Sequence, residues 1–422
     1  MSLKGWLQPY FAMWLTDEAR LHKARAKAER RRKRKGLPHT ITWYHRADDP
    51  YSHLLSQVLP DFLRRYPVQL EYKTVSTPPP ATNPRPELLD SYGFRDAKEL
   101  AAYYGLEMPG QRPTKAEITT AQLMLLELES REDYLEKALE IGTQLWEGQL
   151  DGAFAKGRGA EVESRLESNR GLLEKKGHYS SGMLYYEGEW YWGVDRLYLL
   201  EERLEALGVG EGRTLPEPKA LSFDYDTSRL DFYLSVRSPY SYIALERVFA
   251  LSEKYGVELN LKPILPMVLR GLPVPRSKRM YILLDVKREA NRHDIPFGRI
   301  CDPLGGGVER ALAVFFYLQQ EAGEDAARSY LRSVMQGIWT HGIEIAKDKG
   351  LRKVVERSGN QWSLAKKALS WEEWEKKVEQ NRLDLEGLGM WGVPSFRLGD
   401  FSAWGQDRIW MLESLLKHGK SS

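Results

Sequence analysis

The chain of 422 residues carries one sequence pattern twice, and this internal repeat limits its fold more than any other feature. Residues 40–75 align with residues 229–264 at a constant shift of 189. The matches include Tyr44 with Tyr233, Pro50-Tyr51-Ser52 with Pro239-Tyr240-Ser241, and Lys73 with Lys262. Near the end of each copy the shift becomes 212, so that Trp192-Gly193 and Asp195-Arg196 match Trp404-Gly405 and Asp407-Arg408. The sequence therefore predicts one domain present twice, with similar ends and divergent middles.

Each copy begins with the signature of a βαβ unit. In the second copy, residues 230–236 are aromatic and β-branched, which is typical of a strand. Ser238-Pro239 predicts a helix start, because proline suits the first helical position and serine the cap before it. Gly256 ends this helix, and residues 257–263 predict a second strand. A mostly helical segment at about 270–390 follows, and then two short strands and a last helix at 407–417.

This order of elements is that of a thioredoxin-like domain with helices inserted in its middle. We therefore predict an α/β chain of two tandem thioredoxin-like domains, each with a helical insertion. The expected parts are a basic helical arm at 1–39, a degenerate first domain at 40–208, a linker at 209–228 and a second domain at 229–422.

Lys and Arg residues are concentrated in the arm. Residues 1–40 hold eleven of them against three Asp and Glu, a net charge of +8, and the remaining residues sum to −5 because the total is +3. The run Arg30-Arg31-Arg32-Lys33-Arg34-Lys35 could contact an anionic surface, nucleic acid or membrane, or form a solvated helix end. We favour the solvated helix end, and the acidic remainder argues against nucleic-acid binding as the main function.

Several classes of site and location are excluded by what the sequence lacks. The single cysteine, Cys301, permits neither an intramolecular disulfide nor a CxxC redox pair, which argues against a disulfide oxidoreductase. The histidines form no HxxxH or HExxH pair, so no metal site is predicted. There is no apolar stretch long enough for a membrane span, and residues 1–15 lack the features of a secretory signal. We therefore expect a cytoplasmic protein.

Short motifs in the second copy occur in a characteristic order over residues 229–417. They are Asp231-Phe232-Tyr233, Ser238-Pro239-Tyr240-Ser241-Tyr242, Lys278-Arg279-Met280-Tyr281, Gly392-Val393-Pro394 and Trp404-Gly405-Gln406-Asp407-Arg408. In this order they resemble 2-hydroxychromene-2-carboxylate isomerases and, more distantly, kappa-class glutathione transferases. The resemblance implies a DsbA-like thioredoxin fold, glutathione as cofactor, and a small aromatic or unsaturated acid as substrate. The oligomeric state stays open, and an oligomer is compatible with the sequence.

Ser238 is the candidate catalytic residue. A helix N-terminus presents unpaired N–H groups and the positive end of the helix dipole, so a hydroxyl there can help to hold a thiolate. The resemblance implies that this thiolate belongs to glutathione. The alternative is that Ser238 only caps the helix.

The resemblance also implies the residues that bind glutathione. Pro394 would be the cis-proline of the fold, and Val393 before it would offer its backbone to the peptide part. Asp407, with Gln406 beside it, would pair with the γ-glutamyl ammonium, and Lys278 would receive a carboxylate. The alternatives are an ordinary trans turn at Pro394, a helix-capping Asp407 and a solvated Lys278.

The first copy departs from this pattern, because Asp49 replaces the serine and Gly182 replaces the proline. A carboxylate at that helix start would repel a thiolate, so we expect this half to be a scaffold or an interface. The whole chain is then predicted to be a glutathione-dependent cis–trans isomerase of 2-hydroxychromene-2-carboxylate type. The alternatives are a kappa-type glutathione transferase and a non-catalytic duplicated scaffold.

Overall fold

The computed structural model describes residues 3–220 and 226–418, so parts of the expected arm (1–2), linker (221–225) and second domain (419–422) lie outside the described residues. The contacts divide the chain into two compact units. The N-terminal unit comprises residues 22–220 and 275–278, and the C-terminal unit comprises residues 1–21, 221–274 and 279–422. The first residues of the arm therefore group with the C-terminal unit, and the expected boundaries at 39, 208 and 228 stay predictions.

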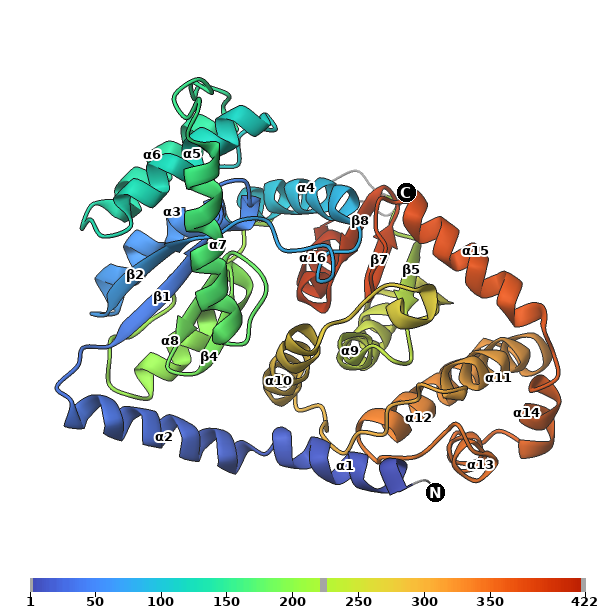
Figure 1. Cartoon of the computed structure of the whole chain (residues 1–422). Coiled ribbons are helices and arrows are strands. Elements are labelled where there is room, and N and C mark those ends of the chain that lie inside the picture. The colour runs from blue at the N-terminus through green and yellow to red at the C-terminus, as the bar shows by residue number, and fades with distance from the viewer. Residues whose placement is uncertain (1–2, 221–225, 419–422) are drawn as a thin grey trace. The chain divides into compact units, whose positions relative to one another are not determined.

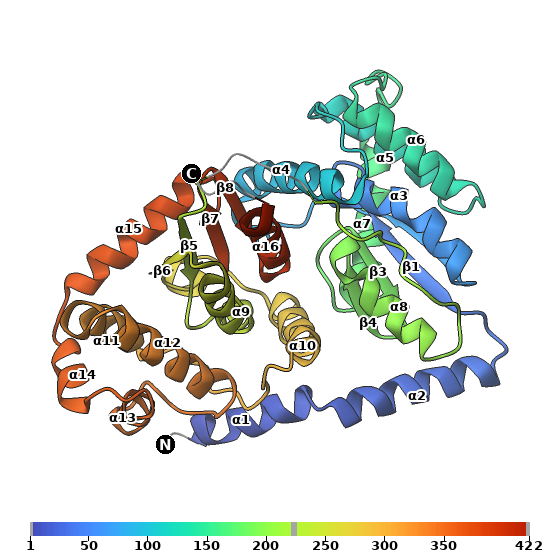
Figure 2. The same cartoon turned by 180° about the vertical axis from the view of Figure 1, so that it is seen from behind.

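The N-terminal unit is built around a four-stranded sheet, whose strands β1, β2 and β4 are labelled in Figure 1. The strand order is β2-β1-β3-β4. Strand β1 runs parallel to β2 and antiparallel to β3. The strands are β1 (Thr40–His45), β2 (Gln69–Thr74), β3 (Met183–Tyr186) and β4 (Glu189–Trp192). The helices are α2 (Glu18–Arg34, of which residues 22–34 belong to this unit), α3 (Pro50–Arg65), α4 (Pro86–Tyr104), α5 (Lys115–Leu128), α6 (Tyr134–Trp146), α7 (Gly159–Lys175), the 3-10 turn η1 (Val194–Arg196) and α8 (Leu197–Glu205). Helix α8 packs against β4, as the rear view shows (Figure 2).

The C-terminal unit repeats this sheet in the order β6-β5-β7-β8. Strand β5 runs parallel to β6 and antiparallel to β7. The strands are β5 (Arg229–Leu234), β6 (Glu258–Pro263), β7 (Ser395–Leu398) and β8 (Phe401–Trp404). The helices are α1 (Leu3–Leu15), α9 (Pro239–Tyr255), η2 (Met267–Arg270), α10 (Arg276–Arg292), α11 (Gly307–Ala322), α12 (Glu324–Trp339), α13 (Asp348–Arg357), α14 (Trp362–Ala368), α15 (Glu373–Gly387), η3 (Gln406–Arg408) and α16 (Ile409–His418). The last helix, predicted at 407–417, thus starts as a 3-10 turn, and the segment predicted as mostly helical contains α10 to α15.

The core of the C-terminal unit lies between the sheet and its helices. Phe232 of β5 is fully buried and stacks on Phe396 of β7 with ring centroids 5.2 Å apart. Helix α9 packs against α12 and α16. Its end at Gly256 has φ of +66°, a left-handed cap that glycine adopts without steric cost. The expected fold, two thioredoxin-like domains with helical insertions, is confirmed.

The repeat extends further along the chain than the sequence motifs suggested. Helices α4 and α10 keep the shift of 189, because Asp96 of α4 corresponds to Asp285 of α10. The hydroxyl of Tyr51 donates to Asp96 Oδ2 at 2.7 Å, and the hydroxyl of Tyr240 donates to Asp285 Oδ2 at the same distance. Both carboxylates are buried, at 1% and 0% exposure. Each unit therefore joins its first βαβ helix to its inserted helices through an equivalent buried bond.

Candidate functional site

Ser238 stands at the N-cap of α9, in extended backbone geometry. Its Oγ accepts a hydrogen bond from the backbone N–H of Ser241 at 3.1 Å and donates one to the carbonyl oxygen of Val393 at 3.3 Å. Pro239 occupies the first helical position, where a missing N–H costs nothing. Ser238 is only half-buried, so one side chain caps the helix, contacts the loop before β7 and stays accessible.

The loop before β7 contains the cis peptide bond expected from the sequence. The bond between Val393 and Pro394 is cis, so that prediction is confirmed. Gly392 precedes it and lies against the indole of Trp404: a Cβ atom at this position would be 1.9 Å from Trp404 Cζ2. Trp404 in turn meets Trp391 edge to face, with centroids 5.0 Å apart. The two indoles border the loop that carries Val393, and only glycine fits beside them.

Gln406 and Asp407 lie in the turn η3 that follows β8. Gln406 is 1% exposed, and its amide nitrogen donates to Glu289 Oε2 at 2.8 Å and to Asp407 Oδ1. Its amide oxygen accepts from the guanidinium of Arg247. Asp407 itself is half-buried. The Gln406 side chain is thus held on both sides of its amide and fixes one oxygen of the Asp407 carboxylate.

Lys278 lies in the first turn of α10 and groups with the N-terminal unit. Its ammonium donates to the carbonyl oxygen of Thr82 at 3.0 Å and lies 5.9 Å from the ring centroid of Tyr179. Burial lowers the pKa of this amine to about 8, because desolvation disfavours its charged form. Among the predicted site residues, the structure joins Ser238, Val393 and Pro394 directly, whereas these contacts of Lys278 are with N-terminal residues.

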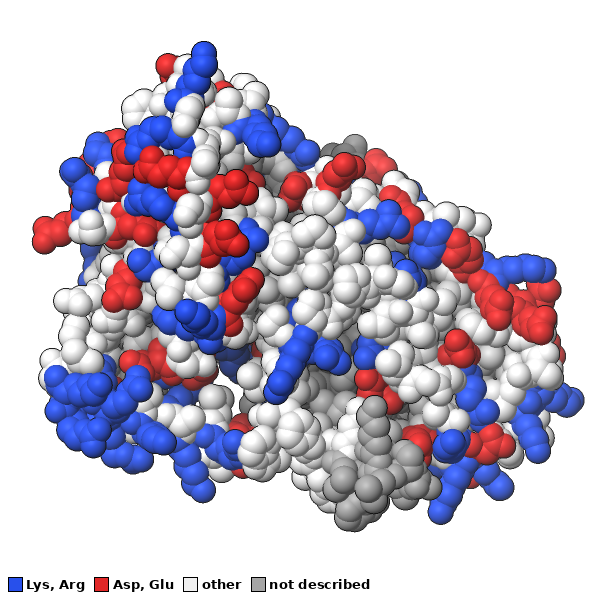
Figure 3. Space-filling view, in the orientation of Figure 1, with Lys and Arg blue, Asp and Glu red and all other residues white. Residues whose placement is uncertain are grey.

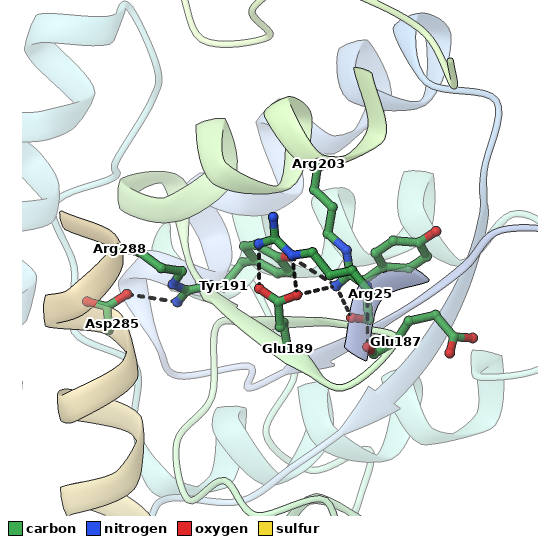
Figure 4. Close-up of polar contacts among 8 residues, drawn as sticks. Arg25, Glu187, Glu189, Tyr191, Arg203, Asp285 and Arg288 are labelled. Carbon is green, nitrogen blue, oxygen red and sulfur yellow. Dashed lines mark hydrogen bonds and ion pairs between the residues drawn. The ribbon is translucent and has the colours of Figure 1, made fainter. Parts of the chain in front are cut away.

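Two charged groups near Ser238 were not among the predicted site residues. The guanidinium of Arg237 forms a bidentate pair with Asp302 at 2.6 and 2.7 Å. Asp285, which accepts from Tyr240, also accepts from Arg288 at 2.9 Å (Figure 4). The repeated spacing of tyrosine and aspartate in the two copies is the signal that could have identified the Tyr240–Asp285 bond.

The corresponding helix start in the N-terminal unit is closed by its own side chains. Asp49 caps α3 and is 6% exposed. One carboxylate oxygen accepts from the hydroxyls of Ser52 and Ser181 at 2.9 and 3.1 Å, and the other accepts from the N–H of Tyr51 at 3.2 Å. Gly182 has φ of +65°, and a Cβ there would lie 3.0 Å from Asp49 Oδ2. Protein donors therefore occupy the carboxylate that replaces the serine.

Neither a reactive thiol nor a metal cluster is visible in the described parts of the chain. Cys301 is 3% exposed, and burial raises the pKa of its thiol to about 11, so the thiol is protonated at neutral pH. Across residues 3–220 and 226–418 there is no group of three or more His, Cys, Asp and Glu side chains that could hold a metal ion. In the same residues no helix is both long and apolar enough to cross a bilayer.

Comparison with known proteins finds relatives of the C-terminal part of the chain. Residues 229–417 match the DsbA-like thioredoxin domain family. A 2-hydroxychromene-2-carboxylate isomerase of Pseudomonas putida is 30% identical over 196 residues, which are 44% of this chain and 93% of that protein. The protein of the same name from Pseudomonas sp. (strain C18) is 27% identical and matches 44% of this chain and 88% of its own length. A solved structure of a 2-hydroxychromene-2-carboxylate isomerase is 28% identical, with a TM-score of 0.38, over 44% of this chain and 92% of that one.

These matches lie in the C-terminal part of the chain, residues 229–417, which holds Ser238 and the cis-proline. Through residues 229–417, the chain therefore belongs to the 2-hydroxychromene-2-carboxylate isomerase family of DsbA-like thioredoxin domains.

Proposed function

We propose that the protein is a cytoplasmic, glutathione-dependent cis–trans isomerase of 2-hydroxychromene-2-carboxylate type that acts on a small aromatic acid, with Ser238 as its catalytic residue. The observation that carries the proposal is the position of the Ser238 hydroxyl. It lies at the start of a 17-residue helix and 3.3 Å from the carbonyl oxygen that precedes the cis-proline.

The groups around Ser238 suit the different parts of glutathione. The positive end of the α9 dipole and the Ser238 hydroxyl favour a thiolate. The half-exposed Val393 offers backbone polar groups to the peptide part, and the half-buried Asp407 offers a carboxylate to the ammonium. When bound, glutathione would supply a thiolate nucleophile that adds to the conjugated double bond and is expelled after rotation, so that it is not consumed.

The residues of the chain would hold and orient these groups. Rotation of the Ser238 hydroxyl away from the Val393 carbonyl would direct its proton to the thiolate, while the Oγ still accepts from Ser241. Gln406 is buried and engaged, so we assign it to positioning Asp407. Trp404, which is partly exposed, would form an aromatic wall for the substrate. Lys278 stays a proposed partner of a carboxylate, one that must exchange its bond to Thr82.

Binding of glutathione to the wild type and to Ser238→Ala, measured by calorimetry and by thiolate absorbance, tests the proposal. Loss of a hydrogen bond to a charged group costs about 1.5–3 kcal/mol, so we expect binding at least about tenfold weaker in the variant. Thr114→Ala is the matched control, because Thr114 also caps a helix, α5, in the N-terminal unit. This control should cost comparable stability and leave binding unchanged.

The result also separates the alternative functions. No binding of millimolar glutathione to the wild type would overturn the proposal in favour of a duplicated scaffold. If glutathione binds, incubation with an unsaturated aromatic acid distinguishes the two enzymes: isomerised product without a conjugate supports the isomerase, and a stable released conjugate identifies a transferase.

A further inference from the structure

Helix α1 exposes an apolar, mostly aromatic face. Tyr10, Phe11, Met13 and Trp14 are 50%, 60%, 46% and 52% exposed. Among the described residues, three of the four large exposed aromatic side chains lie in this one short stretch. The rings of Phe11 and Trp14 stack with centroids 5.8 Å apart. Such a concentration of apolar surface marks an interaction site rather than ordinary surface variation.

The opposite face of α1 is docked on the C-terminal unit, so the aromatic face has a defined direction. Ala12 and Thr16 are 7% and 6% exposed. Thr16 lies so close to Gly298 that a Cβ atom added to this glycine would be 2.7 Å from Thr16 Oγ1. A Cβ atom added to Gly342 would be 3.0 Å from Pro9 Cβ. Because Pro9, Ala12 and Thr16 are spaced three and four residues apart, they lie on one side of α1, and the aromatic residues lie on the other side.

Helix α2 is also anchored on one side only, by charge. Arg25 forms a bidentate pair with Glu189 of β4 at 2.8 and 2.7 Å, and the buried Arg203 pairs with the same carboxylate at 3.0 Å (Figure 4). Glu29 and Arg32, on the same side of the helix, pair with each other at 2.7 Å. No residue of α2 is buried. Its attachment therefore rests on polar contacts, and these determine which face turns outward.

The outward face of α2 is strongly basic. The exposed basic residues on this face include Lys23, Lys27, Arg30, Arg31 and Arg34. Their spacing of four, three, one and three residues places them on one stripe of the helix. Lys and Arg gather over the C-terminal half of α2 at the lower left of Figure 3. Within the described part of the chain, Arg31 alone in this set forms an ion pair, with Glu187 at 3.4 Å, so most of the positive charge on the stripe is not neutralised by an acidic side chain.

We propose that α1 and α2 together bind the surface of a membrane that contains anionic phospholipids. Trp, Tyr and Phe side chains are favoured at the boundary between headgroups and acyl chains, and a basic helix adds attraction to anionic headgroups. Arg20, in the first turn of α2, stacks on Trp14 of α1, with its Cζ atom 3.2 Å from the centroid of the indole ring. The aromatic and basic parts are therefore adjacent in the chain. Nucleic acid would account for the basic stripe but not for the exposed Met13 and Phe11. The proposal is independent of the function proposed for Ser238.

Flotation of the full-length protein with vesicles tests the proposal. We expect binding to vesicles of phosphatidylglycerol and phosphatidylcholine, weakened by salt, and little binding to phosphatidylcholine alone. Lys27→Gln with Arg31→Gln should weaken binding about twentyfold or more, since each basic residue contributes about fivefold near an anionic surface. Phe11→Ser with Trp14→Ser should weaken it by about tenfold or more.

The controls carry the same substitutions at sites outside α1 and α2. Lys366→Gln with Lys367→Gln removes two exposed charges from α14, and Phe154→Ser removes an aromatic side chain that is 54% exposed. Both should bind vesicles like the wild type, and unchanged thermal unfolding of every variant excludes misfolding. The proposal is overturned if anionic vesicles do not bind at low salt. It is also overturned if the basic variant loses binding to a DNA duplex instead, or if the aromatic variant only converts a dimer to a monomer.

Discussion

Substituting Gly392 by alanine should destabilise the C-terminal unit and disturb the loop that carries the cis-proline. The added Cβ would lie 1.9 Å from Cζ2 and 2.3 Å from Cε2 of Trp404. Ordinary carbon–carbon contacts are at about 3.5–4.0 Å, so the overlap is about 1.5 Å or more. Either the loop or the indole must move, and if the indole moves it leaves its edge-to-face contact with Trp391.

The overlap indicates a cost near the upper end of the usual range. Overpacking by a single carbon typically costs 1–3 kcal/mol, and we expect about 3 kcal/mol here because two rings restrict the relaxation. For a unit of this size that corresponds to a decrease in the unfolding temperature of about 6–12 °C. Glutathione binding should weaken as well, because Val393 directly follows the substituted residue.

A double-mutant cycle, measured by calorimetric unfolding of each variant, tests whether the cost comes from the overlap with Trp404. In a Trp404→Leu background the indole is absent, so Gly392→Ala should cost at least about 1 kcal/mol less than in the wild type. Gly387→Ala is the matched control, because its Cβ would meet nothing within 4 Å and its backbone lies outside the left-handed region. It should be neutral or slightly stabilising. Equal costs of Gly392→Ala in both backgrounds would refute the argument from the overlap with Trp404.

Three further predictions follow from buried polar groups. Tyr240→Phe and Tyr51→Phe each remove a hydroxyl that lies 2.7 Å from a buried carboxylate. Each substitution should therefore lower the free energy of unfolding, measured with urea, by about 1.5–3 kcal/mol. Only Tyr240→Phe should also weaken glutathione binding, measured by calorimetry. Glu189→Ala removes the carboxylate that pairs with Arg203, whose side chain is 4% exposed. The substitution should lower the free energy of unfolding by about 3 kcal/mol. A loss below about 1 kcal/mol would contradict a buried ion pair. Burial lowers the pKa of His45 to about 3 in the folded protein. Below about pH 6.5 the unfolded state therefore binds the proton more readily than the folded state, and stability falls as the pH falls. The His45→Phe variant should lose less stability than the wild type between about pH 7 and pH 4.

Local sequence signals predicted some features of the candidate site and not others. Serine before proline predicts the N-cap of α9, and Gly-Val-Pro before a strand predicts the cis bond by resemblance; both features are present in the structure. The engagement of Gln406 by Glu289 and Arg247 had no local signal, since these partners lie 117 and 159 residues away in the chain. Such pairings depend on how α9, α10 and the last strands pack, which no short motif encodes.

The sequence by itself determined the duplicated architecture, because the alternation of strands and helices and the cap residues are written into each copy and act over a few residues. Only the tertiary structure decided which faces are covered. It shows that Asp49 is satisfied by its own neighbours, that Lys278 contacts the Thr82 carbonyl, and that α1 buries Ala12 while leaving Trp14 exposed. A helical pattern shows that a helix has two faces, but its partner is selected by surfaces that distant parts of the chain bring together.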